Sequence, residues 1–261
     1  MIKLSVVVIT YNEERNIARC LESVKEIADE MVVVDSISTD QTKAICLKYG
    51  VRFIEQPFLG YIEQKNFALK FATHDHVLSL DADEALSPEL INSIQETKRS
   101  FSATGYTMNR FTNYCGKWIR HCGWYPDTKL RLFDHTKGKW GGINPHDQFF
   151  LEDGSTIKHL KGDILHYSYY TRDDHFKQIE RFTDIAAQAY YQAGKKPSCL
   201  KMWLSPLSKF IRDYFFNLGL LDGKAGFEIC TLSAKATYLK YRKLSKLYRE
   251  RKPLDKKKHQ R

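Results

Sequence analysis

The sequence predicts an α/β protein with a mostly parallel, doubly wound sheet and a C-terminal helical extension. Over the first hundred residues, short β-branched runs alternate with segments of helical periodicity. The middle of the chain changes to aromatic, alternating runs that are typical of antiparallel strands. After about residue 172, apolar residues keep helical spacing. We therefore expect a first domain at residues 1–170, a basic helical extension at 171–251 and a disordered basic tail at 252–261.

The elements of the first hundred residues follow from their apolar pattern. Short, mainly apolar runs predict strands at residues 4–9, 31–34, 51–54 and 76–80, and the β-branched run at 4–9 is typical of a strand buried on both faces. Helical spacing predicts a helix over 13–27 and another over 61–72. Between them, the Ser38-Thr39-Asp40 segment offers a helix N-cap, and Pro88 occupies the first position of a helix that runs to about Lys98. This alternation indicates right-handed crossovers between parallel strands.

The remaining elements complete the sheet and the extension. We expect antiparallel strands near residues 106–108, 129–133 and 164–166, and a turn-rich loop over 141–147. A first helix spans residues 176–189, a second opens at Ser205-Pro206, and a third, basic helix spans 227–249. The apolar stripes of these helices fit packing on the first domain or in a helical pair, and equally an amphipathic anchor on a membrane surface.

Composition and charge narrow the class of protein. A chain of 261 residues with 43% hydrophobic residues can bury a sizeable core, and no segment is long and apolar enough to span a membrane. The six scattered cysteines indicate reduced thiols in a cytosolic protein. Residues 195–261 carry 18 Lys and Arg against five Asp and Glu, whereas the first 194 residues carry a small net negative charge. The basic end predicts an anionic partner, a membrane surface or a nucleic acid.

Polar residues follow three of the predicted strands. Asp81 and Asp83 come directly after the fourth strand, Thr10-Tyr11-Asn12-Glu13 follows the first, and Asp35 follows the second. Ligands of doubly wound sheets bind at this edge, where the carboxyl ends of the strands meet. Paired carboxylates make an oxygen-rich site for Mg²⁺ or Mn²⁺, which could bridge the phosphates of a nucleotide. No glycine-rich dinucleotide or P-loop pattern follows the first strand.

Four ordered motifs resemble the family 2 glycosyltransferases, which are inverting enzymes with the nucleotide-sugar-binding GT-A fold. They are residues 5–14, Val32 to Thr42, Gln64 to Ala68, and Leu78 to Glu84. Residues 124–127 and 130–133 are similar to the subgroup that includes lipopolysaccharide core β-1,4-glucosyltransferases. The resemblance covers residues 3–170 well and the helical end more loosely.

The resemblance implies a role for each matching residue. The nucleotide-sugar pocket would be formed by Thr10, Tyr11, Glu13, Asp35, Gln64, Lys65 and Asp81. A Mn²⁺ or Mg²⁺ ion would be held by Asp81, Asp83 and His166. Asp147, in the position after His146, would be the general base, one methylene shorter than the Glu usual in the subgroup. The acceptor would contact Trp124, Tyr125 and Arg131.

These roles imply a single in-line displacement of UDP from a UDP-sugar, with a hexose, glucose by resemblance, as the transferred group. The acceptor would be a lipopolysaccharide core or another lipid-linked glycan, with the enzyme cytoplasmic and peripherally bound to the inner membrane. Capsule, exopolysaccharide and polyprenyl-linked glycans are alternative acceptors. The family often has Gly where this chain has Ile37, and a β-branched residue disfavours positive φ, so we expect that loop to differ.

Two other classes explain some of the same features less completely. A nucleotidyltransferase also uses paired carboxylates and a metal, but its glycine-rich phosphate loop is absent from the N-terminus. A nucleic-acid-binding protein would use the basic end of the chain, but no stacking or groove-reading module accompanies that charge. We therefore expect no nucleic-acid partner.

Overall fold

The computed structural model describes residues 1–144 and 146–250, and the chain divides into two compact units. The first unit comprises residues 1–112 and 126–168, and the second comprises 113–125 together with the chain from residue 169 onward. Residues 113–125, which the sequence analysis assigned to the first domain, therefore group with the C-terminal helices. The tail expected to be disordered, 252–261, lies outside the described residues.

The first unit is built on four parallel strands. They are β1 (Leu4–Thr10), β2 (Glu30–Asp35), β3 (Arg52–Glu55) and β4 (His76–Asp81), in the order β3-β2-β1-β4. The register places Thr10 beside Asp35 and Ile9 beside Asp81. The polar residues at the ends of β1, β2 and β4 are therefore brought to the same edge of the sheet, as predicted.

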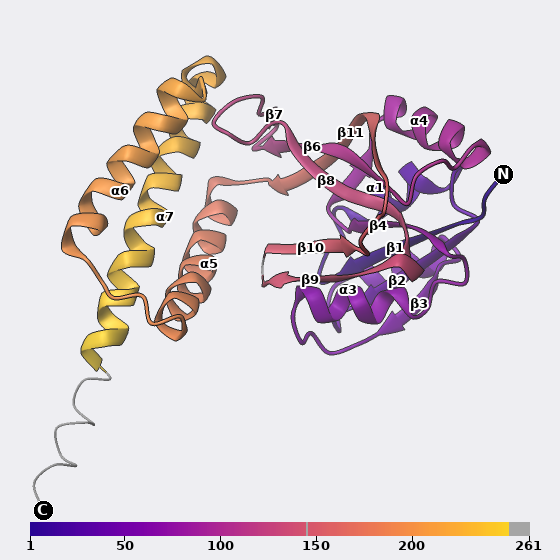
Figure 1. The fold of residues 1–261 in the computed structure, drawn as a ribbon, viewed down its shortest axis with the longest axis horizontal. Coiled ribbons are helices and arrows are strands. Elements are labelled where there is room, and N and C mark those ends of the chain that lie inside the picture. The colour runs from indigo at the N-terminus through magenta and orange to yellow at the C-terminus, as the bar shows by residue number, and fades with distance from the viewer. Residues whose placement is uncertain (145, 251–261) are drawn as a thin grey trace, which may run out of the picture. The chain divides into compact units, whose positions relative to one another are not determined.

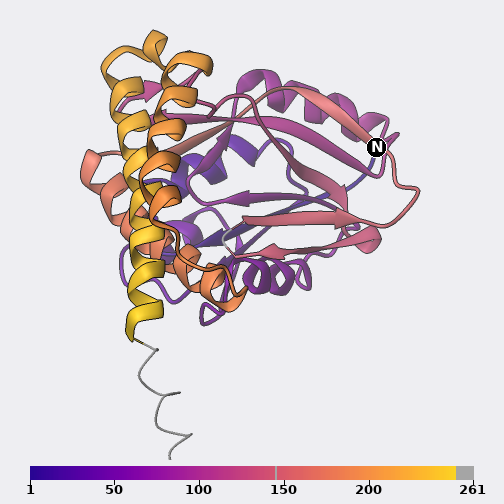
Figure 2. The ribbon, with the colours of Figure 1, turned by 60° about the vertical axis from the view of Figure 1, so that its left-hand side comes forward.

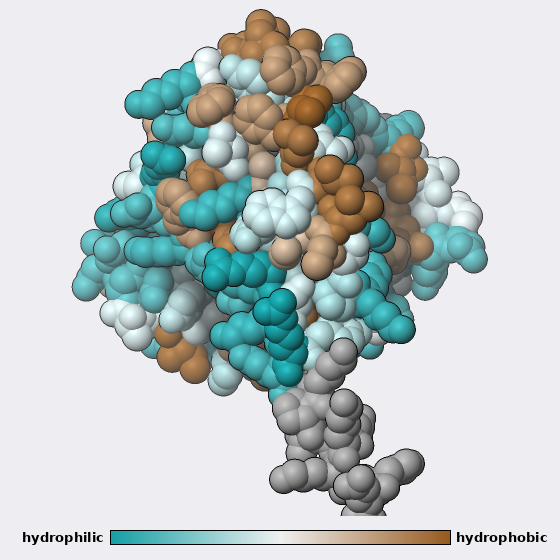
Figure 3. Space-filling model, turned by 90° about the vertical axis from the view of Figure 1, so that its left-hand side faces the viewer, coloured by the Kyte–Doolittle hydropathy of each residue, from teal (hydrophilic) through white to brown (hydrophobic). Residues whose placement is uncertain are grey.

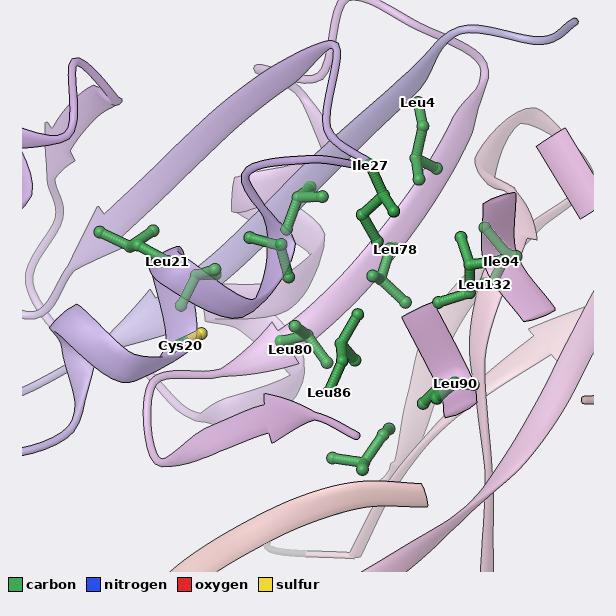
Figure 4. Close-up of a cluster of buried hydrophobic side chains, with 14 of the residues drawn as sticks. Leu4, Cys20, Leu21, Ile27, Leu78, Leu80, Leu86, Leu90, Ile94 and Leu132 are labelled. Atoms are coloured by element: carbon green, nitrogen blue, oxygen red, sulfur yellow. The ribbon is translucent and has the colours of Figure 1, made fainter. Parts of the chain in front are cut away.

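Helices cover both faces of these strands because successive side chains of a strand point to opposite faces. These helices are α1 (Ile17–Val24), α2 (Thr42–Lys48), α3 (Tyr61–Leu69) and α4 (Pro88–Arg99). Val6 and Val8 are buried in a cluster with residues of α1 and α4, which Figure 4 shows in part. Val7 and Ile9 are buried in a second cluster with residues of α3. Figure 1 shows α3 on one side of the sheet and α4 on the other.

Four further strands extend the sheet beyond β4 in the order β8-β6-β11-β5, with β8 antiparallel to both β4 and β6, and β5 antiparallel to β11. They are β8 (Asp127–Asp134), β6 (Gly105–Tyr114), β11 (Ile157–Tyr169) and the short β5 (Glu84–Leu86). After the turn η1 (His135–Lys137), β9 (Gly138–Ile143) and β10 (His146–Leu151) pair as a separate hairpin. Residues 141–143, 146 and 147, which the sequence placed in a turn-rich loop, are therefore strand residues of this hairpin. Phe149 and Trp140 anchor the hairpin by packing on Phe133.

The second unit consists of three long helices and a short hairpin. The helices are α5 (Arg172–Gln192), α6 (Cys199–Ile211) and α7 (Gly223–Glu250), and α6 runs beside α7 in Figures 1 and 2. The turns η2 (Arg212–Phe216) and η3 (Gly219–Asp222) join α6 to α7. Strand β7 (Lys117–Trp118) pairs with the end of β6. Ile119 and Cys122 follow β7 and share a buried cluster with Ile229 and Cys230 of α7, which explains why 113–125 belongs to this unit.

One helix start was predicted wrongly. The sequence placed the start of α6 at Ser205-Pro206, but α6 begins at Cys199 and includes Pro206. Ser198 caps it by accepting a hydrogen bond from the backbone N–H of Lys201. Among the described helices, none is long and apolar enough to cross a membrane.

Candidate active site

Lys65 lies at the centre of the polar edge of the parallel sheet. It comes from α3, which also carries Gln64, and both side chains are buried. The Lys65 Nζ lies 3.1 Å from Oδ1 of Asp81 and 2.7 Å from Oδ2 of Asp147. Its ammonium also lies over the Trp140 ring, 4.6 Å from the centroid. One buried cation thus joins the end of β4 to the β9–β10 hairpin.

Arg131 supplies a second buried cation at Asp81. Its Nη2 donates to Oδ2 of Asp81 and to Oε1 of Glu84, each at 3.0 Å. Glu84 in turn accepts the backbone N–H of Asp81 at 2.9 Å and faces Arg110 at 3.5 Å. Burial alone would raise the pKa of Asp81, but the charges of Lys65 and Arg131 outweigh it and hold that pKa well below its usual range. Asp81 is therefore ionised and fixed in position.

Asp83 and His166 form a separate pair beside this network. The Nε2 of His166 lies 3.1 Å from Oδ2 of Asp83, and its Nδ1 lies 3.3 Å from Oγ1 of Thr112. In the part of the chain that the structure describes, no three His, Cys, Asp or Glu side chains gather as a ready-made metal cage. Asp81, Asp83 and His166 are thus neighbours in the fold, with Asp81 engaged by the two buried cations.

Glu13 follows β1 and faces the Asp83 and His166 pair. Its carboxylate accepts a hydrogen bond from Asn16 at 2.7 Å, and its backbone N–H donates to Thr42. Burial, and then the nearby charge of Asp83, raise the pKa of Glu13 to about 7. At neutral pH this side chain is therefore present in both protonated and ionised forms.

The loop after β2 includes an isoleucine with positive φ. Asp35 is buried and accepts hydrogen bonds from the backbone N–H and the hydroxyl of Ser38. Ile37, between them, has φ of 63°, the conformation that the sequence analysis judged unsuitable for a β-branched residue. Ile37 thus adopts the backbone that the sequence disfavours, and the bonds from Ser38 to Asp35 hold the turn in place. The left-handed backbone at an isoleucine costs roughly 1–2 kcal/mol.

Several polar atoms at this edge are buried without a hydrogen-bond partner from the described residues. Unpaired buried groups of this kind cost roughly 1–3 kcal/mol each, so they usually lie where a ligand or solvent completes them. They are Oγ1 of Thr10, Nε2 of Gln64, Nε and Nη1 of Arg131, and Nε1 of Trp140. Most of them are donors, which suits a ligand rich in oxygen acceptors.

The structure does not bring every predicted site residue into this network. Tyr11 is exposed on the loop after β1. Trp124 and Tyr125 belong to the second unit, where Trp124 packs against Tyr114 and Tyr169. Conversely, Glu84, Arg110 and Trp140 enter the network without having been predicted. Glu84 could have been predicted, because it directly follows the Asp81-Ala82-Asp83 motif. Arg110 and Trp140 could not, because they reach the network only through contacts between residues far apart in the sequence.

Buried cations, unpaired donors and carboxylates at the carboxyl edge of a parallel sheet define a binding protein or enzyme for an anionic, oxygen-rich ligand. The chain belongs to glycosyl transferase family 2, whose model matches residues 5–173. It is therefore a glycosyltransferase, and the predicted α/β fold of the GT-A type with a C-terminal helical extension is confirmed.

Relatives of similar length match most of the chain. It is 32% identical to an uncharacterized glycosyltransferase of Rickettsia typhi, over 95% of this chain and 88% of the relative. It is 29% identical to the lipopolysaccharide core biosynthesis glycosyltransferase LpsC of Rhizobium meliloti, over 86% of this chain and 85% of LpsC. A crystal structure of S. aureus TarS 1–349 has a TM-score of 0.47 and 16% identity, and the match covers 95% of this chain and 91% of that one.

Proposed function

We propose that this chain is an inverting, metal-dependent glycosyltransferase that moves a hexose, glucose by resemblance, from a UDP-sugar to a lipopolysaccharide core acceptor. The single observation that carries the proposal is the buried Lys65 ammonium, which touches both Asp81 and Asp147. It brings Asp81, expected on the donor side, and Asp147, the candidate base, together at one site. The likeness to LpsC along most of both chains supports the core acceptor over other surface glycans.

The donor would bind along the edge formed by β1, β2 and β4. Asp35 and Thr10, neighbours in the sheet register, would take the uridine, with Tyr11 and Glu13 on the loop above them. Gln64, with its unpaired Nε2, would donate to the donor, and Lys65 would face the diphosphate. Asp81 would hold Lys65 in place and contact the ribose side. Recognition of the base and sugar by a few buried groups fits the donors left unpaired here.

The residues present fit a divalent ion that is completed by substrate oxygens. Mg²⁺ is usually bound by one or two carboxylates together with substrate phosphates, and Mn²⁺ also accepts imidazole. Asp83 would bind the ion directly and His166, already beside that carboxylate, would supply a nitrogen ligand, with Asp81 next to them. When bound, the ion would stabilise the charge that develops on the departing diphosphate.

Asp147 would act as the general base in a single displacement at the anomeric carbon. It accepts the proton of the acceptor hydroxyl while the bond to the diphosphate breaks, which inverts the anomeric configuration and leaves no covalent enzyme intermediate. In the structure Asp147 is paired with Lys65. A diphosphate that draws the Lys65 ammonium toward itself would free the Asp147 carboxylate for the acceptor, so Lys65 would link donor binding to base activation.

The acceptor would be carried by a lipid at the cytoplasmic face of the inner membrane. Trp124 and Tyr125 remain our candidates for stacking on its sugars. Arg131 is buried and bound to Asp81 and Glu84, so we assign it to fixing Asp81 in place of the acceptor contact expected from the sequence.

Calorimetric titration of UDP, with and without Mn²⁺, tests the donor site. We expect metal-dependent binding that is lost in Asp83→Asn and kept in Asp153→Asn, a matched change in an exposed turn of the same unit. Metal-independent binding, or binding unaffected by Asp83→Asn, would remove the proposed metal role. No binding of UDP, GDP or CMP by the folded protein would contradict the nucleotide-sugar site.

A further inference from the structure

Helix α6 and the turns that join it to α7 expose large apolar residues. On α6 they recur at positions 200, 203, 204, 207 and 211, the spacing of a single helical stripe. Trp203 is 64% exposed and Leu207 57%, and Phe216 in η2 is 78% exposed. We call this set the apolar face; its members are Leu200, Trp203, Leu204, Leu207, Ile211, Phe215, Phe216, Leu218, Leu220 and Leu221. In Figure 3, brown, apolar residues gather in the upper part of the surface in view.

The apolar face is additional to the side of α6 that packs within the unit. Phe210 and Tyr214 lie on the packed side, against Phe227 at ring-centroid distances of 6.0 and 5.8 Å. These rings join the buried cluster around Ile229 and Cys230. Within the stripe from Leu200 to Ile211, the Trp203 ring also contacts Tyr238 of α7 at a centroid distance of 5.2 Å, but every residue of the stripe remains at least 39% exposed. An apolar surface of this extent on a folded protein marks a contact with a partner or a lipid surface.

Within residues 195–227, the charged side chains that reach the solvent are all basic. Residues 195–227 contain six Lys and Arg and two acidic residues, Asp213 and Asp222. Both acidic side chains are buried, and Asp213 is neutralised by Lys209 at 2.7 Å and Arg212 at 3.2 Å. Lys196, Lys201 and Lys224 are exposed. The segment thus exposes basic side chains to the solvent while both of its acidic side chains are buried. This charge distribution is complementary to an anionic surface.

From this geometry we propose that the apolar face inserts into the interface of an anionic phospholipid bilayer. The inference rests on the proposed function in so far as a lipid-linked acceptor places the enzyme at a membrane. Trp, Phe and Leu on one side with Lys around them is the composition of helices that lie in the headgroup region and bury their apolar side below it. Juxtaposed lysines add attraction to anionic lipids. The occupant is therefore a lipid surface, to which the enzyme binds without spanning it.

Co-sedimentation with vesicles tests this surface in the full-length chain. The vesicles are phosphatidylcholine alone, or phosphatidylcholine with phosphatidylglycerol. We expect Leu207→Ser combined with Phe216→Ser to lower the partition coefficient on mixed vesicles by roughly 10- to 100-fold, because two inserted side chains are lost. The matched control is Leu47→Ser combined with Ile157→Ser, at 57% and 56% exposed positions of the first unit, which should bind like wild type.

Further measurements decide between the other outcomes. Lys196→Gln with Lys201→Gln should weaken binding to the mixed vesicles and leave binding to phosphatidylcholine alone unchanged. UDP titration of every variant shows that the first unit is folded, and it reports separately on the donor site, so a failed donor site does not imitate a failed membrane contact. Equal binding by wild type and Leu207→Ser/Phe216→Ser would overturn the proposal. So would a wild-type protein that ignores vesicles and dimerises through these residues in sedimentation velocity, because the occupant would then be a second copy.

Discussion

At the scale of single residues, Lys65 explains why the site has two carboxylates that do not repel each other. Its buried ammonium lies within 3.1 Å of Asp81 and 2.7 Å of Asp147, and Arg131 shares Asp81. A buried charge that loses its partners is strongly destabilising, so these groups hold one another in position. If Asp147 is the base, as we propose, it would be released only when Lys65 finds another anion, and the diphosphate of the proposed donor would supply one.

Asp147→Asn separates donor binding from transfer. We expect the variant to keep Mn²⁺-dependent binding of UDP, because the asparagine oxygen can still accept a hydrogen bond from Lys65 and hold it at the site. Sugar transfer should fall by about 10²–10⁴-fold, the usual contribution of a general base. Initial rates of UDP release with saturating acceptor measure the change, and Asp153→Asn is the control. Full transfer activity in Asp147→Asn would show that another group takes the proton.

Glu13 makes stability depend on pH near neutrality. Its pKa is raised from the usual value of 4.5 to about 7, by burial first and then by Asp83, so the folded state binds a proton that the unfolded state has released. The stabilisation that the protonated Glu13 gives the folded state is complete below about pH 4.5 and is lost as the pH rises to about 7. We expect the free energy of unfolding to fall by roughly 1–3 kcal/mol from this cause, a range that allows for the partial exposure of the side chain.

Urea unfolding at several pH values, with EDTA present, measures the Glu13 effect. The fall in the free energy of unfolding between pH 5 and pH 7 should be smaller in Glu13→Gln than in wild type, since glutamine does not titrate. Parallel pH profiles for the two proteins would contradict the assignment.

At the scale of elements, the junction between β11 and α4 depends on Gly162. Its φ is +91°, and a Cβ at this position would lie 2.3 Å from the backbone N of Leu90. The Ser87 hydroxyl fastens the same junction by accepting the N–H groups of Leu90 and Asp163. Because the clash is with backbone in the first turn of α4, relief requires that β11 or the helix move.

Gly162→Ala should therefore be far more destabilising than an ordinary glycine substitution. Gly154 is a matched control, because its φ is +83° but nothing lies within 4 Å of a Cβ there. We expect Gly154→Ala to cost about 1 kcal/mol from backbone conformation alone, and Gly162→Ala to cost at least about 2 kcal/mol more. Chemical denaturation of both variants measures the difference. Equal costs would mean that the junction yields easily.

The sequence predicted those elements whose pattern is local. The runs at residues 4–9, 31–34 and 76–80 appear as β1, β2 and β4, because continuous apolar residues between polar ends need no distant partner to be recognised. The β9–β10 hairpin was missed, since glycines conceal an alternating pattern whose burial comes from Phe133, a residue on another strand. Pro206 misled the prediction of α6, because proline is also tolerated inside a helix that tertiary packing stabilises.

The sequence could predict which residues lie at the end of each strand, but not which of them contact residues from other elements. Asp35, Asp81 and Thr10 could be placed at one edge because parallel strands share a direction. The ion pairs that join Asp81 to Lys65 and Arg131 depend on where α3 and β8 pack, and no spacing in the sequence records that. At Ile37 the local preference itself was misleading. A β-branched residue disfavours positive φ, but hydrogen bonds from the Ser38 backbone and side chain to Asp35 hold Ile37 in that conformation.

At the scale of the whole molecule, apolar surface and basic charge occur in different segments of the C-terminal part. The apolar face lies within residues 200–221, whereas residues 251–261 contribute six Lys and Arg and one Asp. Insertion of apolar side chains depends weakly on salt, whereas attraction between charged groups is screened over about 8–10 Å at physiological ionic strength. The two contributions to the proposed membrane binding can therefore be separated by lipid composition and salt.

Truncation after Glu250 isolates the charge contribution. The shortened chain keeps the apolar face and loses five net positive charges. We expect its affinity for vesicles containing phosphatidylglycerol to fall by about tenfold or more at low salt, and its affinity for phosphatidylcholine alone to stay the same. Leu207→Ser with Phe216→Ser should instead weaken binding to both. If truncation reduced binding to neutral vesicles as well, residues 251–261 would contribute more than charge. If it changed neither, the apolar face and the lysines beside it would suffice for the enzyme to reach a lipid-borne acceptor.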